Sequence, residues 1–277
     1  MLIRVLSAFS ALPVVLGLLW IGGWAFGALA LVVGAVSLWE FNAMTQPPED
    51  TGAKAVFTVL GVGLLALELT GTLRGGVALL AVGFLPMASV SYYLVRTGDV
   101  ATAAARGGLG VLGMTWAGGL LGATCALRLL PDGFSWLVLA CAFAWGSDSG
   151  AYFVGRFLGR TKLYPKISPA KTVEGALGGI VVGTAMGFGV WFVVGPSEIP
   201  ATHLLVIGPI GAFMGQVGDL TESLLKRSVG VKDSGRFMPG HGGMFDRIDA
   251  LLFAGPTLLA YALWVADVPI RWLSWPP

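Results

Sequence analysis

Charged side chains gather near the end of an otherwise apolar chain. The stretch GHGGMFDRID, residues 240–249, holds two aspartates and an arginine beside a histidine and three glycines. Asp246 and Asp249 are three residues apart, so a helix that starts here would carry both on one face. Gly242 and Gly243 would let backbone amides approach an anion without obstruction by side chains. The stretch therefore predicts carboxylates next to an anion-binding loop.

A second group of charges precedes this stretch. Asp219, Glu222 and Lys226 are spaced three and four residues apart and would share one face of a helix. Two helices that present carboxylates to a common point, joined by a loop of Lys, Arg, His and Gly, predict a divalent cation held beside phosphates. Hard oxygen ligands favour Mg²⁺, which commonly uses one or two carboxylates and completes its shell with water and substrate phosphate.

Asp148 is the third notable carboxylate. It lies in the segment WGSDSGAY, well inside an apolar run that predicts a helix. A carboxylate in such a position is costly unless a cation or hydrogen-bond donors meet it. A structural salt bridge to a neighbouring helix is the alternative interpretation.

The loop GRTKLYPKISPAKTVEG, residues 159–175, carries basic residues that anionic lipids would attract whatever the function. The second half of the loop, from Ser168, also contains residues that could bind a phosphate. Ser168 followed by proline resembles a helix start, with proline at the first helical position. Hydroxyls and amides would then face the membrane surface beside Lys171 and Thr172, an arrangement that suits a phosphate oxygen.

The elements that position these residues are predicted to be membrane helices. The chain of 277 residues is 56% hydrophobic and 12% charged, and its mean hydropathy is +0.81. We therefore expect an all-α, polytopic integral membrane bundle. Apolar runs predict nine spans at 6–21, 23–45, 55–72, 76–95, 108–130, 134–157, 175–195, 202–225 and 247–266. We expect one membrane domain, with scaffold and lipid-facing spans in 1–133 and catalytic spans in 134–266.

The basic residues predict the orientation of these spans. If the amino terminus is cytoplasmic, only Arg74, Arg128 and Arg271 of the 17 lysines and arginines fall on the outer side. The sequence thus predicts a multi-pass protein of the inner (cytoplasmic) membrane, with the active site in the cytoplasm and the carboxyl terminus outside.

Two further features concern packing. Cys125 and Cys141 lie in apolar segments without neighbours for a metal or redox site, so we expect them in the core. Gly175, Gly179, Gly183 and Gly187 recur every four residues and form a ridge that lets another helix approach closely. Packing within the chain and a homodimer seam are both open interpretations of this ridge.

One long motif resembles a known family. The stretch SLLKRSVGVKDSGRFMPGHGGMFDRID, from Ser223 to Asp249, is similar to the signature of the phosphatidate cytidylyltransferases, also called CDP-diacylglycerol synthases. The one departure is Met238, where the family usually has isoleucine, leucine or phenylalanine. SPAKTVEG and WGSDSGAY also look like the family's upstream segments. The resemblance covers roughly residues 145 to 250, whereas the first five spans match only in hydrophobic character.

The resemblance implies that CTP and phosphatidate react to give CDP-diacylglycerol and pyrophosphate, with magnesium required. Under this reading Asp219 and Asp246 are the principal metal ligands, and Asp148 and Asp249 support them. The remaining assignments fall into three groups. Lys226, Arg227, Lys232 and Arg247 would bind the triphosphate; Ser168, Lys171 and Thr172 would hold the lipid phosphate; His241, Gly242 and Gly243 would shape the nucleotide loop. We expect membrane lipids and no nucleic acid among the partners.

Other functions remain to be separated from this one. A CTP-dependent kinase of a lipid alcohol such as a polyprenol would need the same spans, magnesium and basic loop. A phosphotransferase of the CDP-alcohol class would carry Asp-Gly-x-x-Ala-Arg, which is absent here. An ion-coupled transporter could place its coupling ion at the intramembrane carboxylates. Its carboxylates would be expected at the midplane, however, and not with phosphate-type cations at one face.

Overall fold

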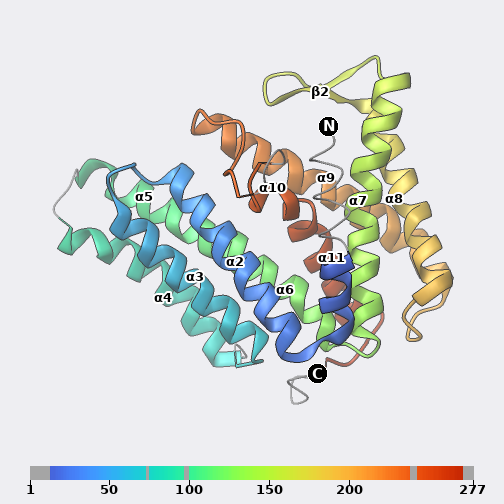
Figure 1. Cartoon of the computed structure of the whole chain (residues 1–277), viewed down its shortest axis with the longest axis horizontal. Helices are drawn as coiled ribbons and strands as arrows, with labels where there is room; N and C mark the ends of the chain where they lie inside the picture. Colours follow the sequence, from blue (N-terminus) through green and yellow to red (C-terminus); the bar gives the residue numbers. More distant parts are fainter. Residues whose placement is uncertain (1–12, 73–74, 97–99, 238–241, 271–277) are drawn as a thin grey trace. The chain divides into compact units, whose positions relative to one another are not determined.

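The computed structural model describes residues 13–72, 75–96, 100–237 and 242–270. Almost all of the secondary structure in these ranges is helical (Figure 1). Contacts divide the chain into two compact units. The first comprises Met1–Gly122 with Asp233–Asp246, and the second comprises Ala123–Lys232 with Arg247–Trp275. The signature stretch is thus shared between the units along the chain.

The first unit is built from long apolar helices that follow one another in sequence. They are α2 (Gly23–Thr45), α3 (Thr51–Leu69), α4 (Gly75–Val95), α5 (Val100–Gly113) and the π-helix η1 (Met114–Leu120). The Asp50 carboxylate caps α3 by accepting from the Ala53 amide at 3.0 Å. Phe57 and Met114 are fully buried with Ala53 in the core of this unit. The helix α6 (Leu121–Ala126) and the 3₁₀ turn η2 (Leu127–Leu129) continue the chain.

The second unit contains the helices α7 (Gly133–Leu158), α8 (Val173–Val194), α9 (Leu204–Ser228) and α11 (Leu251–Trp264). A short 3₁₀ turn η3 (Ala201–His203) precedes α9, and the one-turn helix α10 (Phe245–Ile248) precedes α11. Cys125 and Cys141 are both buried, as the sequence predicts.

The glycine ridge of α8 explains the close packing of α7 and α8, which run side by side (Figure 1). A Cβ at Gly179 would lie 2.7 Å from the Ser147 carbonyl oxygen of α7, and one at Gly183 would lie 3.0 Å from the Phe143 carbonyl oxygen. All four ridge glycines are buried within the chain. Packing within one chain is therefore the interpretation that the structure bears out, and the ridge gives a homodimer no support.

Six helices of the described residues are long and apolar enough to cross a membrane, and two shorter apolar helices accompany them, Leu80–Val95 and Leu251–Trp264. The all-α, polytopic fold class is confirmed. The count of nine spans stays a prediction, and much of the predicted first span, 6–21, lies outside the described residues. The predicted span 108–130 belongs to a longer helical run that begins at Val100 and ends at Leu129.

The predicted helix start at Ser168 is wrong. The strands β1 (Lys162–Tyr164) and β2 (Ser168–Thr172) form an antiparallel hairpin in which Tyr164 pairs with Ser168 and Lys162 with Thr172. The helix α8 starts only at Val173, where the Thr172 hydroxyl oxygen caps it by accepting from the Gly175 amide at 3.1 Å. The Thr172 cap, rather than the proline, therefore sets the start of the helix.

Candidate active site

A cleft of about 520 Å³ opens in the second unit, between α7, the hairpin, α8 and α9. Four of the site residues predicted from the sequence line it: Asp148 from α7, Lys171 and Thr172 from β2, and Asp219 from α9. Residues far apart in the sequence thus line one cavity, in which the carboxylates of Asp148 and Asp219 lie near the ammonium group of Lys171.

Lys171 and Asp219 form an ion pair across this cleft. The Lys171 Nζ lies 2.6 Å from the Asp219 Oδ2, and the two side chains are 28% and 29% exposed. The pair is therefore reachable from the cleft. A substrate phosphate could bind Lys171, and a cation could bind Asp219, if the two side chains separate.

Asp148 and Asp249 add negative charge around Asp219. Asp148 interacts electrostatically with four charged residues. Asp219 and Asp249 repel its negative charge, and Lys171 and Arg247 attract it. Asp249 lies in the turn between α10 and α11, is 8% exposed, and accepts from the Ala250 amide at 2.7 Å. Burial raises the pKa of the Asp249 carboxyl, and the nearby charge of Asp219 raises it further. A cation here would relieve this repulsion.

Within the described ranges, no three His, Cys, Asp or Glu side chains stand close enough together to hold a metal ion by themselves. The donor set nevertheless fits Mg²⁺, because this ion commonly takes one or two carboxylates and fills its shell with water and substrate phosphate. In the second unit Asp219 would hold the ion, and Asp148 and Asp249 would support it.

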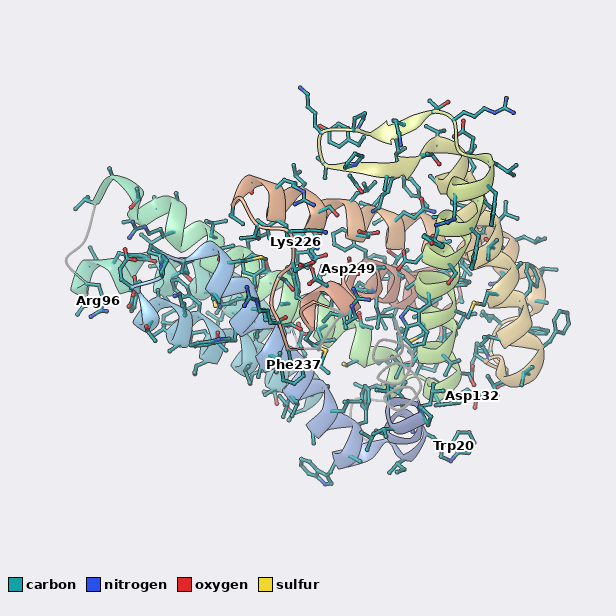
Figure 2. The ribbon with its side chains drawn as sticks, turned by 45° about the horizontal axis from the view of Figure 1, so that its top comes forward. Trp20, Arg96, Asp132, Lys226, Phe237 and Asp249 are labelled. Atoms are coloured by element: carbon teal, nitrogen blue, oxygen red, sulfur yellow. The ribbon has the colours of Figure 1, made fainter. Side chains whose placement is uncertain are left out.

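The cations of α9 are engaged with the protein. The Lys226 Nζ donates to Glu222 Oε2 at 2.9 Å, and both side chains are buried. Figure 2 labels Lys226 on α9 and Asp249 in the segment that precedes α11. Arg227 donates to the carbonyl oxygens of Ile167 and Val231, at 3.4 and 3.1 Å. Arg227 thus joins the hairpin loop to the chain that follows α9.

The signature loop, here residues 233–246, contains Asp246 in the first unit. Asp246 accepts from the Ser234 amide at 3.0 and 3.2 Å and from the Gly243 amide at 2.8 Å. Gly242 has φ +82°, and a Cβ there would lie 2.7 Å from Asp246 Oδ2. The Asp246 carboxylate therefore joins the two ends of the loop. Joint coordination of one metal by Asp219 and Asp246 stays a prediction.

Four other predicted site residues lie outside the lining of the cleft or outside the described residues. Ser168 pairs with Tyr164 in the hairpin and does not line the cleft. Lys232 and Arg247 are exposed on either side of the signature loop. His241 lies outside the described residues.

Three polar residues of the cleft were not predicted as site residues from the sequence: Tyr152, Arg156 and Gln216. Tyr152 and Arg156 follow Asp148 by four and eight residues, so helical spacing could have placed them on its face. Arg156 donates to the Tyr152 hydroxyl at 3.2 Å. Gln216 donates to the Ser147 hydroxyl of α7 and to the Ala176 carbonyl oxygen of α8, both at 2.9 Å. It therefore links three helices beneath the cleft.

Apolar spans around a cleft with carboxylates, a lysine and an arginine define a polytopic membrane protein with a charged cleft. Comparisons with known proteins give the family. A sequence model of the Cytidylyltransferase family matches residues 2–265. The chain belongs to this family, which confirms the resemblance of Ser223–Asp249.

Among curated relatives, the phosphatidate cytidylyltransferase of Brucella suis biovar 1 (strain 1330) is 34% identical over 279 residues, which covers 96% of this chain and 95% of the relative. That of Pseudomonas aeruginosa (strain PAO1) is 35% identical over 270 residues, covering 95% and 97%. That of Bacillus subtilis (strain 168) is 49% identical over 126 residues, 46% of each chain.

Proposed function

We propose that this membrane protein transfers the cytidylyl group of CTP to phosphatidate, giving CDP-diacylglycerol and pyrophosphate. It is a nucleotidyltransferase of phospholipid biosynthesis. The observation that carries the proposal is the Lys171–Asp219 pair, which faces a cleft in a chain of the cytidylyltransferase family. Such a pair offers one group to a phosphate and the other to a metal that carries the triphosphate.

The chemistry requires positioning more than proton transfer. An oxygen of the phosphatidate phosphate attacks the α-phosphorus of CTP, and the bond from that phosphorus to the bridging oxygen breaks, so pyrophosphate leaves. The attacking phosphate is already an anion at neutral pH, so a strong general base is unnecessary. The protein must bring two polyanions together and stabilise the charge on the departing pyrophosphate.

The lipid phosphate is assigned to the cations and hydroxyls of the cleft. Lys171 and Arg156 would neutralise it, since both line the cavity. The Thr172 oxygen accepts from the α8 backbone, which leaves its hydroxyl hydrogen to donate to a phosphate oxygen. The Ser168 assignment is weaker because Ser168 pairs in the hairpin away from the cleft.

The triphosphate is assigned to the signature cations. Lys232 and Arg247 are exposed and would bind it, while Lys226 and Arg227 would act from their present contacts with Glu222 and the hairpin. Mg²⁺ bound by Asp219, with Asp148 and Asp249 as supporting carboxylates, would supply charge neutralisation for the phosphates. Glycines 242 and 243, with His241, would shape the loop around the nucleotide.

The orientation belongs to the same proposal. We place the amino terminus, hairpin and signature loop in the cytoplasm, where CTP is available, and the carboxyl terminus outside the inner membrane. Membrane lipids would surround the apolar helices.

The test is to incubate the detergent-purified protein with phosphatidate and CTP labelled at the α-phosphate, with and without Mg²⁺. We expect magnesium-dependent label in a lipid product and release of pyrophosphate. Label that remains in CDP, with a newly phosphorylated lipid, would identify a kinase instead. No turnover by folded protein would contradict both enzymes.

A further inference from the structure

A carboxylate of the first unit, far from the signature in sequence, lies against the signature loop. Glu40 sits in α2, five residues before the helix ends at Thr45, and is 6% exposed. Its Oε2 accepts from the Phe245 amide at 3.0 Å. The amides of Met244 and Phe237 are oriented so that they favour the charge of this carboxylate. One side chain thus interacts with amides from both described ends of the loop, residues 233–237 and 242–246.

The glycines of the loop fit around this carboxylate. A Cβ at Gly243 would lie 2.5 Å from Glu40 Oε2, and a Cβ at Gly235 would overlap Glu40 Oε1. Any larger residue at either position would therefore displace the carboxylate or the loop. Part of the glycine pattern of the signature is thus explained by Glu40, which lies about 200 residues earlier in the chain.

An apolar contact adjoins these hydrogen bonds. Phe245 is fully buried, and its ring packs edge-on against Phe41 of α2 and Trp116 of η1, with centroid distances of 5.7 and 5.6 Å. Glu40 and Phe41 therefore hold the backbone and the ring of the same loop residue. Figure 2 labels Phe237, the last described residue of the first part of the loop.

Asp246, which belongs to the signature itself, also connects the two parts of the loop, because it accepts from the Ser234 and Gly243 amides. Two carboxylates thus tie the two ends of a glycine-rich loop together, one from within the loop and one from a long apolar helix. A buried amide that loses its acceptor is destabilising. Loss of Glu40 would leave the Phe245 amide without its acceptor.

We propose that Glu40 is a positioning residue for catalysis, which holds the described ends of the signature loop, residues 233–237 and 242–246, in the arrangement that binds the triphosphate of CTP. The catalytic part of this inference rests on the proposed function. Glu40 acts through the loop backbone, so its effect should fall on nucleotide binding and turnover together.

The experiment compares Glu40→Gln with Glu68→Gln in the full-length protein. The glutamine keeps one acceptor and replaces the other with a donor that repels an amide. Glu68 is a matched control because it is also a carboxylate of the first unit, on α3, and its buried Oε2 lies beside Gly122 and makes no hydrogen bond within the described residues. Hydrogen–deuterium exchange measures the loop amides, and steady-state kinetics measures kcat and KM for CTP.

We expect the peptides that cover residues 233–246 to exchange at least about tenfold faster in Glu40→Gln, while peptides from α3 and α9 keep the wild-type rate. Turnover should fall by about 10- to 100-fold and KM for CTP should rise, because small misplacements of binding groups cost that much. Glu40→Asp, which keeps both acceptors on a shorter side chain, should recover part of the loss. Glu68→Gln should change neither measurement.

The outcomes separate the two ideas. Unchanged loop exchange in Glu40→Gln would overturn the positioning role. Faster exchange with normal kcat and KM would overturn its link to catalysis. If the wild-type protein makes no CDP-diacylglycerol, the proposed function fails, whereas the exchange result still decides whether Glu40 holds the loop.

Discussion

At the scale of single residues, the Lys171–Asp219 pair is the most informative contact. Its two side chains are more than a quarter exposed, and ion pairs that reach solvent contribute little to stability. Neutralising one partner should therefore leave the fold intact. The pair brings opposite charges to the cleft at the point where a phosphate and a metal are proposed to meet.

The first prediction follows from this pair. Asp219→Asn should lower kcat by about 100-fold or more and weaken the dependence on Mg²⁺, because a carboxamide is a poor replacement for a charged metal ligand. Turnover measured across a magnesium titration checks this. Asp267→Asn is the matched control, since Asp267 is exposed and has φ +51°, a conformation that asparagine tolerates. Normal turnover and magnesium dependence in Asp219→Asn would remove Asp219 from the metal site.

The second prediction concerns the left-handed glycine of the signature. Gly242→Ala should cost about 1–2 kcal/mol in backbone strain and also push a methyl group against Asp246 Oδ2. We expect about a tenfold or larger loss of turnover. Gly230→Ala is the control, because Gly230 has φ +76° with nothing within 4 Å of a Cβ. If both variants lose activity equally, the contact with Asp246 has no special importance.

At the scale of elements, the cleft depends on how closely α7, α8 and α9 approach. Gln216 of α9 fills the space beside Gly179, where a Cβ would lie 2.6 Å from its Nε2 and 2.7 Å from the Ser147 carbonyl oxygen of α7. The ridge therefore sets the separation of the helices that carry Asp148 and Asp219, while β2, next to α8, carries Lys171.

The third prediction tests this separation. Gly179→Ala should lower the melting temperature in detergent by several degrees and reduce turnover, because the methyl group meets backbone as well as the end of Gln216. Gly189→Ala on the same helix has open space around the new Cβ, so it should be neutral or slightly stabilising. Thermal unfolding and product formation check both variants. Equal melting temperatures would show that α7 and α8 can separate at no cost.

The sequence predicted these elements unevenly, for physical reasons. Four glycines at a spacing of four residues predicted a close helix contact, because they lie on one helix face, but only the structure identifies α7 as the partner. The hairpin at residues 162–172 was missed because strands of three and five residues carry little periodicity, and Ser168 before a proline suggested a helix start. The boundary between β2 and α8 is instead set by a local contact, the Thr172 cap.

The candidate site was predictable where charges cluster in sequence and not where the fold supplies them. Asp148, Lys171 and Asp219 were found from their segments, and the structure places all three in one cleft. Glu40 was missed because a single carboxylate in an apolar span has no motif around it. Its isolation was nevertheless a signal, since an intramembrane carboxylate needs a partner.

At the scale of the whole molecule, the alternation of spans and loops predicts which segments face the cytoplasm. The hairpin joins α7 to α8, and residues 265–270 follow α11. Crossings by α8, α9 and α11 would put the hairpin and these last residues on opposite faces. The helix α11 has 14 residues, about 21 Å at 1.5 Å per residue. This length is shorter than the roughly 30 Å of the hydrocarbon core, so the prediction that α11 crosses the membrane is the one to test.

The fourth prediction tests that step with single cysteines at exposed positions. We expect a membrane-impermeant maleimide to label Asp267→Cys in intact cells, and Lys166→Cys only after the membrane is permeabilised. The wild-type chain is the background control, because Cys125 and Cys141 are both buried and should react slowly. Label on Lys166→Cys in intact cells would reverse the orientation. Label on neither variant until permeabilisation would mean that α11 returns to the face it came from, which would place the residues after it beside the CTP-binding side.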